Sequence, residues 1–184
     1  MIVGVGGQGS LLASRLLGNV LLAKGFDVKV SEVHGMSQRG GSVVTYIKFG
    51  EKVYSPVIEK GQADLIVSFE ALEAARWVSF LKKGGKLVMN TQEIEPMPVI
   101  TGAAQYPANI VDTLRSLGEA VIAVDALSLA EQAGTSRAVN VVLMGVISHI
   151  LDFGDKVWND ALEQCVPAKV LEVNKKAFEL GRNA

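Results

Sequence analysis

The sequence contains few of the residues that most often bind metals or cross-link chains. Its 184 residues include one cysteine, Cys165, and two histidines, His34 and His149. A single cysteine excludes a disulfide within the chain, and it excludes an iron–sulfur cluster or a thiolate zinc site built from this chain alone. Two histidines also make a histidine-based metal site a poor hypothesis. We therefore expect no metal site in this chain.

The sequence also lacks a charge excess and a long hydrophobic run. The formal net charge is −1 and there is no long basic run, which argues against nucleic-acid binding. The longest apolar stretch, near VVLMGVISHIL, is about half the length that a membrane-spanning helix needs. The first residues show no signal-peptide pattern. We expect a soluble, cytoplasmic protein with no nucleic-acid or membrane partner.

The first third of the chain alternates between strand and helix patterns. Residues 1–5 form an apolar run that ends in glycines, as a buried parallel strand does. The run is short, and we expect a residue or two of this strand to lie upstream. Residues 10–25 then predict a helix with a wide apolar face, covered on more than one side. Residues 26–33 alternate as a strand, so the unit is expected to be a right-handed βαβ crossover.

A polar, glycine-rich loop follows where a second crossover helix is usual. Residues 34–42 (HGMSQRGGS) have no helical period, and they precede two alternating runs that meet at Gly50 and Glu51. This arrangement predicts a hairpin, so a loop and a β-ribbon would replace the helix.

The remaining sequence resumes the alternation and then becomes helical. Strands are expected at residues 63–70, 86–90 and 119–126, helices at 71–85 and 108–118, and a long excursion at 91–107. From residue 127 the pattern is helical to the end. We predict one α/β domain over residues 1–184: a Rossmann-like, doubly wound, mostly parallel sheet with a β-ribbon insertion and a helical C-terminal third.

The glycine turn at GVGGQGS has the spacing of a dinucleotide-binding fingerprint. Gly4, Gly6 and Gly9 match G-x-G-x-x-G, and Glu32 follows at a distance from which a carboxylate could accept hydrogen bonds from a ribose. The Gln8 amide could face a partner or a cofactor. However, such turns also serve packing or partner contact without a nucleotide, and the loop after Glu32 weakens the nucleotide interpretation.

The second glycine-bearing loop places a guanidinium beside exposed backbone N–H groups. Arg39 is followed by Gly40 and Gly41, an arrangement that suits a phosphate or a carboxylate. The alternative is a turn in which the glycines supply unusual φ angles and Arg39 is solvated.

Four segments together resemble a known family. They are GVGGQGSLLASRLLGNVLLAKG, VSEVHGMSQRGGSVVTYIKFG, YSPVIEKGQADLIVSFEALEAAR and LKKGGKLVMNTQ. They look like the gamma-type domain of 2-oxoacid:ferredoxin oxidoreductases, and HGMSQRGGSV favours the indolepyruvate branch. The resemblance is strong over roughly residues 1–92. It continues more loosely to about residue 180, with AVNVVLMG matching an asparagine-and-glycine helix.

The resemblance implies a subunit of a larger enzyme. A 2-oxoacid such as indolepyruvate would be decarboxylated on thiamine diphosphate, its acyl group passed to coenzyme A, and two electrons sent through [4Fe–4S] clusters to ferredoxin. The large alpha subunit would hold the thiamine diphosphate with its Mg and the clusters. The resemblance assigns no cofactor to the present chain, and the chain alone would be inactive. Whether it forms a homodimer is left open.

The resemblance implies that the residues of two loops face a cofactor, a substrate or the partner subunit. It assigns catalysis to none of them. They are Gly4, Gly6, Gly7, Gln8 and Gly9 of the first loop, and Ser37, Gln38, Arg39, Gly40 and Gly41 of the second. Both loops would lie at the carboxyl ends of strands in a doubly wound sheet.

Other chemically interesting residues have structural explanations. Glu70 and Glu73 could share acid–base work, but acids in the first turn of a helix are explained by its dipole. His34 is expected to bond to backbone, and Cys165 to be a buried apolar residue. His149 and Met144 are expected in the core or at an interface.

Two alternatives from other classes stay open at this point. One is a stand-alone NAD(P)-binding dehydrogenase or regulatory module, which nucleotide binding by the isolated chain would favour. The other is a non-catalytic scaffold subunit, which would tolerate replacement of Arg39 by alanine.

Overall fold

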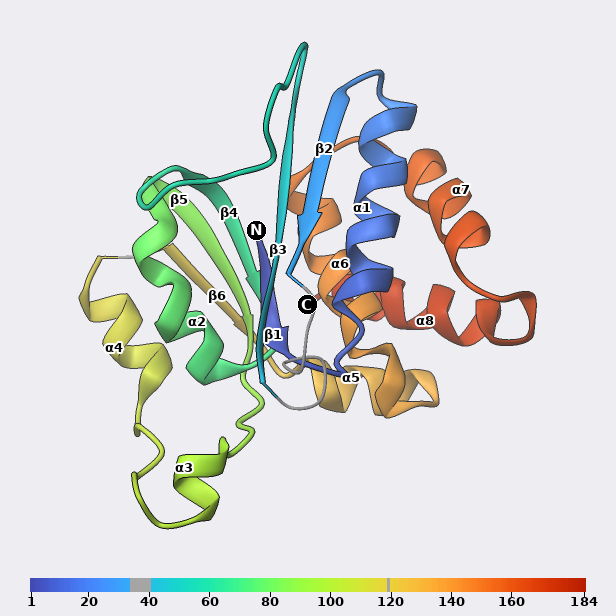
Figure 1. Ribbon diagram of the computed structural model, residues 1–184. Coiled ribbons are helices and arrows are strands. Elements are labelled where there is room, and N and C mark those ends of the chain that lie inside the picture. Colours follow the sequence, from blue (N-terminus) through green and yellow to red (C-terminus); the bar gives the residue numbers. More distant parts are fainter. Residues whose placement is uncertain (34–40, 119) are drawn as a thin grey trace.

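The protein is a twisted sheet with helices on both faces (Figure 1). The computed structural model describes residues 1–33, 41–118 and 120–184. Within these residues the strands are β1 (Ile2–Val5), β2 (Asp27–Glu32), β3 (Ser42–Gly50), β4 (Ala63–Ser68), β5 (Leu81–Asn90) and β6 (Ala120–Val124). They form one six-stranded sheet in the order β2-β3-β1-β4-β5-β6.

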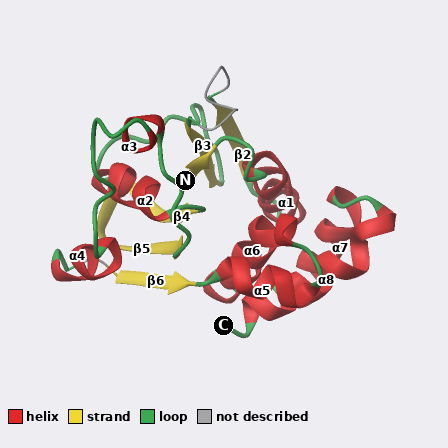
Figure 2. Ribbon diagram, turned by 90° about the horizontal axis from the view of Figure 1, so that it is seen from below, coloured by secondary structure: helices red, strands yellow, loops and turns green. Residues whose placement is uncertain are grey.

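The helices divide between the two faces. Those of the described chain are α1 (Ser10–Ala23), α2 (Ala71–Trp77), α3 (Met97–Ile100), α4 (Ile110–Ser116), α5 (Ala126–Ala133), α6 (Val139–Ile150), α7 (Asp155–Cys165) and α8 (Leu171–Arg182). Figure 2 shows α1 and α5–α8 grouped on one side and α2 and α4 on the other. Each side has its own apolar core, and the larger one lies under α1, α6 and α8. The predicted α/β class and helical C-terminal third are confirmed.

Helix α1 follows its sequence pattern closely. Leu16, Leu17, Val20 and Leu21 are all buried, so the apolar stripe is wide. The helix packs on the sheet and, on another side, against α7. Coverage on more than one side, expected from that stripe, is therefore confirmed.

The ribbon is present, but its strands are not the predicted ones. Strand β3 pairs antiparallel with β2 from Asp27↔Gly50 to Glu32↔Thr45, and antiparallel with β1 on its other side. The hairpin predicted at Gly50 and Glu51 is wrong, because residues 51–62 form no strand. Strand β2 runs parallel to β1, as a βαβ unit requires, but β3 lies between the two strands.

The other half of the sheet is parallel, as expected. Strand β1 pairs with β4, β4 with β5, and β5 with β6, each in parallel register. The carboxyl ends of these strands therefore meet at one edge, together with the start of β3. The glycine turn after β1 and the segment at Gly41 lie at this edge (Figure 1).

Candidate functional site

The first glycine turn leaves β1 and opens α1 in a conformation that needs glycine. Gly7 has φ 102° and Gly9 has φ 85°, both in the region that side chains rarely adopt. The turn is closed by a hydrogen bond from the Gln8 N–H to the Val5 carbonyl, 3.2 Å long. Gly4 is buried at the end of β1, whereas Gly7 is exposed.

Gln8 fastens this turn to the neighbouring strand. Its Oε1 accepts a hydrogen bond from the Val5 N–H at 2.8 Å, and its Nε2 donates to the Phe69 carbonyl at 3.0 Å. Both ends of the amide are thus engaged within the chain. In this position Gln8 holds the ends of β1 and β4 together.

Gly9 fastens the turn to the C-terminal half of the chain. The buried Asn140 of α6 donates from Nδ2 to the Gly9 carbonyl over 3.1 Å. A Cβ on Gly9 would lie 2.4 Å from that same Nδ2. The contact gives a structural role to the asparagine of AVNVVLMG. Position 9 is restricted to glycine both by its φ angle and by this neighbour.

The two glycine-bearing loops meet at the edge of the sheet. The Gly6 N–H donates to the Gly41 carbonyl at 2.9 Å, and Val5 is paired with Ser42. Ser37, Gln38, Arg39 and Gly40, together with His34, lie outside the described residues. Of the second loop, the structure therefore places Gly41 beside the first loop.

A cluster of buried carboxylates lies next to Gly41, and sequence reasoning missed it. Glu70 and Glu73 are each 1% exposed, although they lie at the start of α2, where the sequence places them. Glu73 accepts hydrogen bonds from Ser42 Oγ and from Trp77 Nε1, and it pairs with the half-exposed Arg76 at 2.7 Å. Hydrogen bonds to every side of the carboxylate offset the cost of burying it.

Glu70 organises the start of α2 and the long excursion after β5. Its Oε2 caps the helix by accepting from the Glu73 N–H at 2.8 Å, and its Oε1 accepts from the Ile94 N–H at 3.1 Å. Tyr106 donates its hydroxyl to the same carboxylate. Burial, and then this bond to an anion, raise the pKa of Tyr106 far above its ordinary value.

A pocket lies beside this cluster. Its walls combine the carboxylates and Arg76 with apolar side chains from β1 and from the excursion, and its volume is about 270 Å³. The lining includes Gly41, Leu72, Ile94, Pro96 and Met97. The excursion therefore forms one wall of a polar and apolar pocket at the edge where the glycine loops meet.

Glu32 is bound to α1. Its Oε1 accepts a hydrogen bond from the buried Ser14 Oγ at 2.6 Å. Glu32 also lines a second pocket, of about 270 Å³, together with Gly6, Gly7 and Gly9. The acid and the glycine turn therefore share a pocket, as the dinucleotide interpretation requires. The Ser14 contact gives Glu32 a role within the fold without a ribose.

Two further residues are placed by the structure. Burial raises the pKa of the half-buried Cys165 thiol, which accepts a hydrogen bond from Asn19 Nδ2 at 3.3 Å. His149 is exposed, so of the two expected places, core or interface, the core is excluded, whereas Met144 is fully buried. Over the described ranges, no cluster of three or more His, Cys, Asp or Glu residues could hold a metal ion.

Comparison with known proteins identifies the family. The family model described as pyruvate ferredoxin/flavodoxin oxidoreductase matches residues 1–184. The chain belongs to this family. It is 44% identical to the indolepyruvate oxidoreductase subunit IorB of Thermococcus kodakarensis and 42% identical to that of Pyrococcus horikoshii. Each match covers 100% of this chain and 94% of the relative.

Solved structures of family members share the fold. The gamma subunit of a keto/oxoacid ferredoxin oxidoreductase from Geobacter sulfurreducens superposes with a TM-score of 0.72 at 20% identity. The superposition covers 94% of that subunit and 99% of this chain. The pyruvate oxidoreductase subunit PORC of Thermotoga maritima gives a TM-score of 0.71 at 19% identity. These two likenesses support the fold, and the curated relatives support a subunit rather than a stand-alone dehydrogenase.

No helix in the described part of the chain has the length and apolar character needed to cross a membrane.

Proposed function

We propose that this chain is the small subunit of an indolepyruvate:ferredoxin oxidoreductase. The observation that carries the proposal is the 44% identity to a named IorB subunit over the whole chain. The reaction would be the oxidative decarboxylation of a 2-oxoacid to its acyl-CoA, with two electrons passed to ferredoxin. The complex would act in the cytoplasm.

The cofactors belong to a larger partner in this proposal. A [4Fe–4S] cluster takes four cysteine ligands, and the single Cys165 cannot supply them. Thiamine diphosphate, which supplies the decarboxylation chemistry when bound, and its Mg would likewise sit on the large subunit. Coenzyme A would be a substrate of the complex.

In this proposal the chain contributes the glycine turn that lies at the carboxyl edge of the parallel strands. Gln8 fixes the first glycine turn to β4, Asn140 fixes it to α6, and the Gly6–Gly41 bond fixes it to the second loop. A turn held in this way can present backbone N–H groups to an anionic group held by the partner, and in this proposal the Arg39 side chain would bind the same group. The proposed facing residues are Gly4, Gly6, Gly7, Gln8, Gly9, Ser37, Gln38, Arg39, Gly40 and Gly41.

Co-expression with the large subunit tests the assignment. The two chains are expected to purify as a complex that reduces ferredoxin or a viologen dye under anaerobic conditions, dependent on indolepyruvate and coenzyme A. Either chain alone should be inactive. Full activity of the large chain alone, or failure of the two chains to associate, would contradict the proposal.

Replacing Arg39 by alanine in the complex separates a facing loop from a scaffold. A charge-assisted contact of about 1.5–3 kcal/mol predicts a loss of activity on the order of tenfold or more. The exposed Arg115 of α4 provides the matched control, and Arg115→Ala should leave turnover unchanged. Equal turnover in both variants would favour a subunit that contributes surface only.

A further inference from the structure

Strand β2 forms one edge of the sheet in the described part of the chain, and every one of its residues is at least partly exposed. Its backbone groups point alternately toward β3 and away from it. Val33, the residue after β2, donates its N–H to the Val44 carbonyl of β3 at 3.2 Å, in the register of the strand pair. The odd-numbered residues of β2 therefore bond to β3. The N–H and C=O groups of Val28 and Val30 point outward from the edge.

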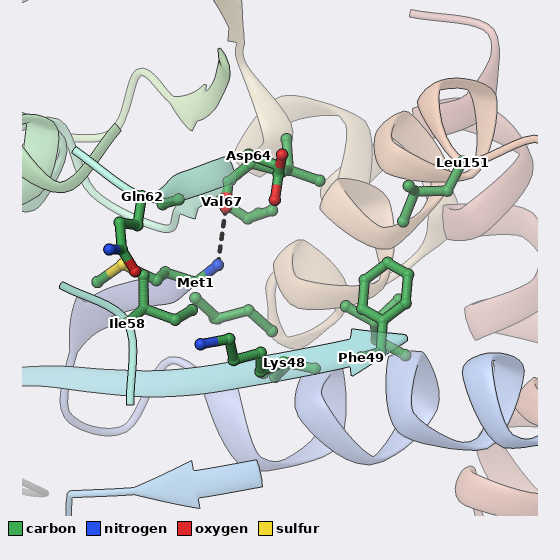
Figure 3. A pocket seen from close by; sticks show the side chains of 13 residues that line it. Met1, Lys48, Phe49, Ile58, Gln62, Asp64, Val67 and Leu151 are labelled. Atoms are coloured by element: carbon green, nitrogen blue, oxygen red, sulfur yellow. Dashed lines mark hydrogen bonds between the residues drawn. The ribbon is translucent and has the colours of Figure 1, made fainter. Parts of the chain in front are cut away.

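The face of this edge that lies toward α1 is apolar and hollowed. A groove of about 420 Å³ runs between β2 and α1, and Val28, Val30 and Leu22 are among its lining residues. Val30 is 44% exposed and Leu22 is 59% exposed. Phe49, which lies opposite Val28 on β3, belongs to the same face, and Figure 3 shows its ring directed toward Leu151 at the end of α6. An edge with apolar side chains and outward backbone groups can pair with a further strand.

The opposite face of β2 carries one acid and one base. Asp27 and Lys29 lie two residues apart on this face, and they form an ion pair within the chain. A lone lysine on an edge strand opposes pairing with another strand. Here an acid lies beside the lysine, so a strand that carries the same two charges in reverse order can pair with both.

A second copy of β2 in antiparallel orientation presents that reverse order. Opposite residues of an antiparallel pair lie on the same face, so a two-fold axis between two copies can pass only through a residue of the strand. With the axis at Val28, Asp27 lies opposite Lys29 of the second copy, and Lys29 lies opposite its Asp27. On the apolar face, Val28 lies opposite Val28 and Phe26 lies opposite Val30.

The neighbouring registers lack this match. A pairing centred on Asp27 or on Lys29 sets two like charges directly against each other, which destabilises a strand pair. A pairing centred on Val30 sets Val28 opposite Glu32, and it leaves the lysine and the aspartate without an opposite charge on the other strand. Of these four registers, the one centred on Val28 is therefore the one that matches both faces.

We propose that two copies of this chain pair through β2, antiparallel and centred on Val28, so that their two sheets become one. Val28 exchanges backbone hydrogen bonds with Val28 of the second copy, and the Val30 N–H donates to the Phe26 carbonyl. The pairing also covers the groove beside α1, where Leu22 is exposed. It concerns this chain alone, so it can be tested without the large subunit and independently of the proposed function.

Charge reversal in mixed samples tests the register. Asp27→Lys gives β2 two positive charges and Lys29→Asp gives it two negative charges, so each variant alone should dimerise on the order of tenfold or more weakly than the unaltered chain. Mixed in equal amounts, the two variants bring opposite charges together at both sites, and the mixed dimer should regain the affinity of the unaltered chain. Lys82→Asp, which breaks an exposed ion pair with Asp64, is the matched control and should dimerise normally. Sedimentation equilibrium at up to about 1 mM measures each sample.

Hydrogen exchange shows whether the dimer uses this strand. The amides of Val28 and Val30 should exchange on the order of tenfold or more slowly in the dimer than in the diluted, monomeric chain. A chain that stays monomeric, single variants that dimerise normally, or a mixture no stronger than its components would overturn the proposal. Dimers that leave the two amides unprotected would place the contact elsewhere, and protection that needs the large subunit would assign the edge to that partner. Either of these results also overturns it.

Discussion

Replacement of Gly9 by alanine should destabilise the fold through a contact with Asn140 as well as through backbone strain. A non-glycine residue at φ 85° costs about 1–3 kcal/mol. The new Cβ would also lie 2.4 Å from Asn140 Nδ2, so the buried asparagine must shift and its hydrogen bond to the Gly9 carbonyl is disturbed. Loss of that bond adds about 0.5–1.5 kcal/mol. The free energy of unfolding should therefore fall by about 1.5–4.5 kcal/mol, which lowers Tm by roughly 3–18 °C in a chain of this size.

Gly7→Ala is the matched control, because Gly7 has φ 102° but a Cβ there meets nothing within 4 Å. It should show the strain without the contact. In the background of Asn140→Ala, Gly9→Ala should cost no more than Gly7→Ala, and a double-mutant cycle measured by urea denaturation gives the coupling. Equal costs for Gly7→Ala and Gly9→Ala, with no coupling to Asn140, would refute the reasoning.

Three further experiments test the buried cluster and the cysteine. Glu73→Gln should lower the free energy of unfolding by about 1.5–3 kcal/mol in urea titrations, because it weakens buried charge-assisted hydrogen bonds. The control Glu163→Gln loses only an exposed ion pair and should cost under about 1 kcal/mol. Similar losses in the two variants would argue against a stabilising role of the buried Glu73. The folded pKa of Tyr106 is raised, so its stabilising contribution is complete below about pH 10 and is lost as the unfolded chain deprotonates above it. Stability measured from pH 8 to 11 should therefore fall less steeply in Tyr106→Phe, and identical slopes would contradict the assignment. Cys165 should react with a thiol reagent at pH 8 more slowly than a free thiol, since burial raises its pKa; labelling at the rate of a model thiol would contradict this.

Elements with a strong local period could be predicted from the sequence. Helix α1 and the helices after residue 125 bury wide apolar stripes, and those stripes are visible as spacing along the chain. The parallel strands β4, β5 and β6 were likewise predictable, because each alternates with a helix or with the excursion, but β5 begins at Leu81, inside the helix expected over residues 71–85. In these segments local pattern and final packing agree.

The order of β1, β2 and β3 could not be read in the same way. The helix between β1 and β2 predicts a βαβ crossover but does not say which strands are neighbours, and the sheet inserts β3 between the two. The sequence between β2 and β3 shows no helical period, and a short connection of this kind favours an antiparallel return, which is how β3 pairs with β2. The segment after Gly50 does not return as a strand. Its Val53 N–H instead donates to the Asp27 carboxylate at 2.9 Å.

The buried carboxylates were hidden for a different reason. Acids at the start of a helix are fully explained by the dipole, so the sequence around Glu70 and Glu73 carries no signal of burial. Their partners come from elsewhere in the chain: Ser42 from β3, and Ile94 and Tyr106 from the excursion. Only the folded chain brings these groups together, so burial at these positions is a tertiary property.

The glycine spacing of the first turn has a sufficient explanation within the chain. A Cβ at Gly4 would lie 2.9 Å from Gln8 Oε1, the Gly6 N–H is bonded to Gly41, and Gly9 is pressed against Asn140. These contacts bring β4, the second loop and α6 onto one turn. Glycine spacing that usually indicates a nucleotide is thus also explained by the contacts that join this turn to β4, to the second loop and to α6. A coupling between Gly9→Ala and Asn140→Ala, measured without any nucleotide, would support that interpretation, because backbone strain alone would lower the stability of any such turn and show no coupling.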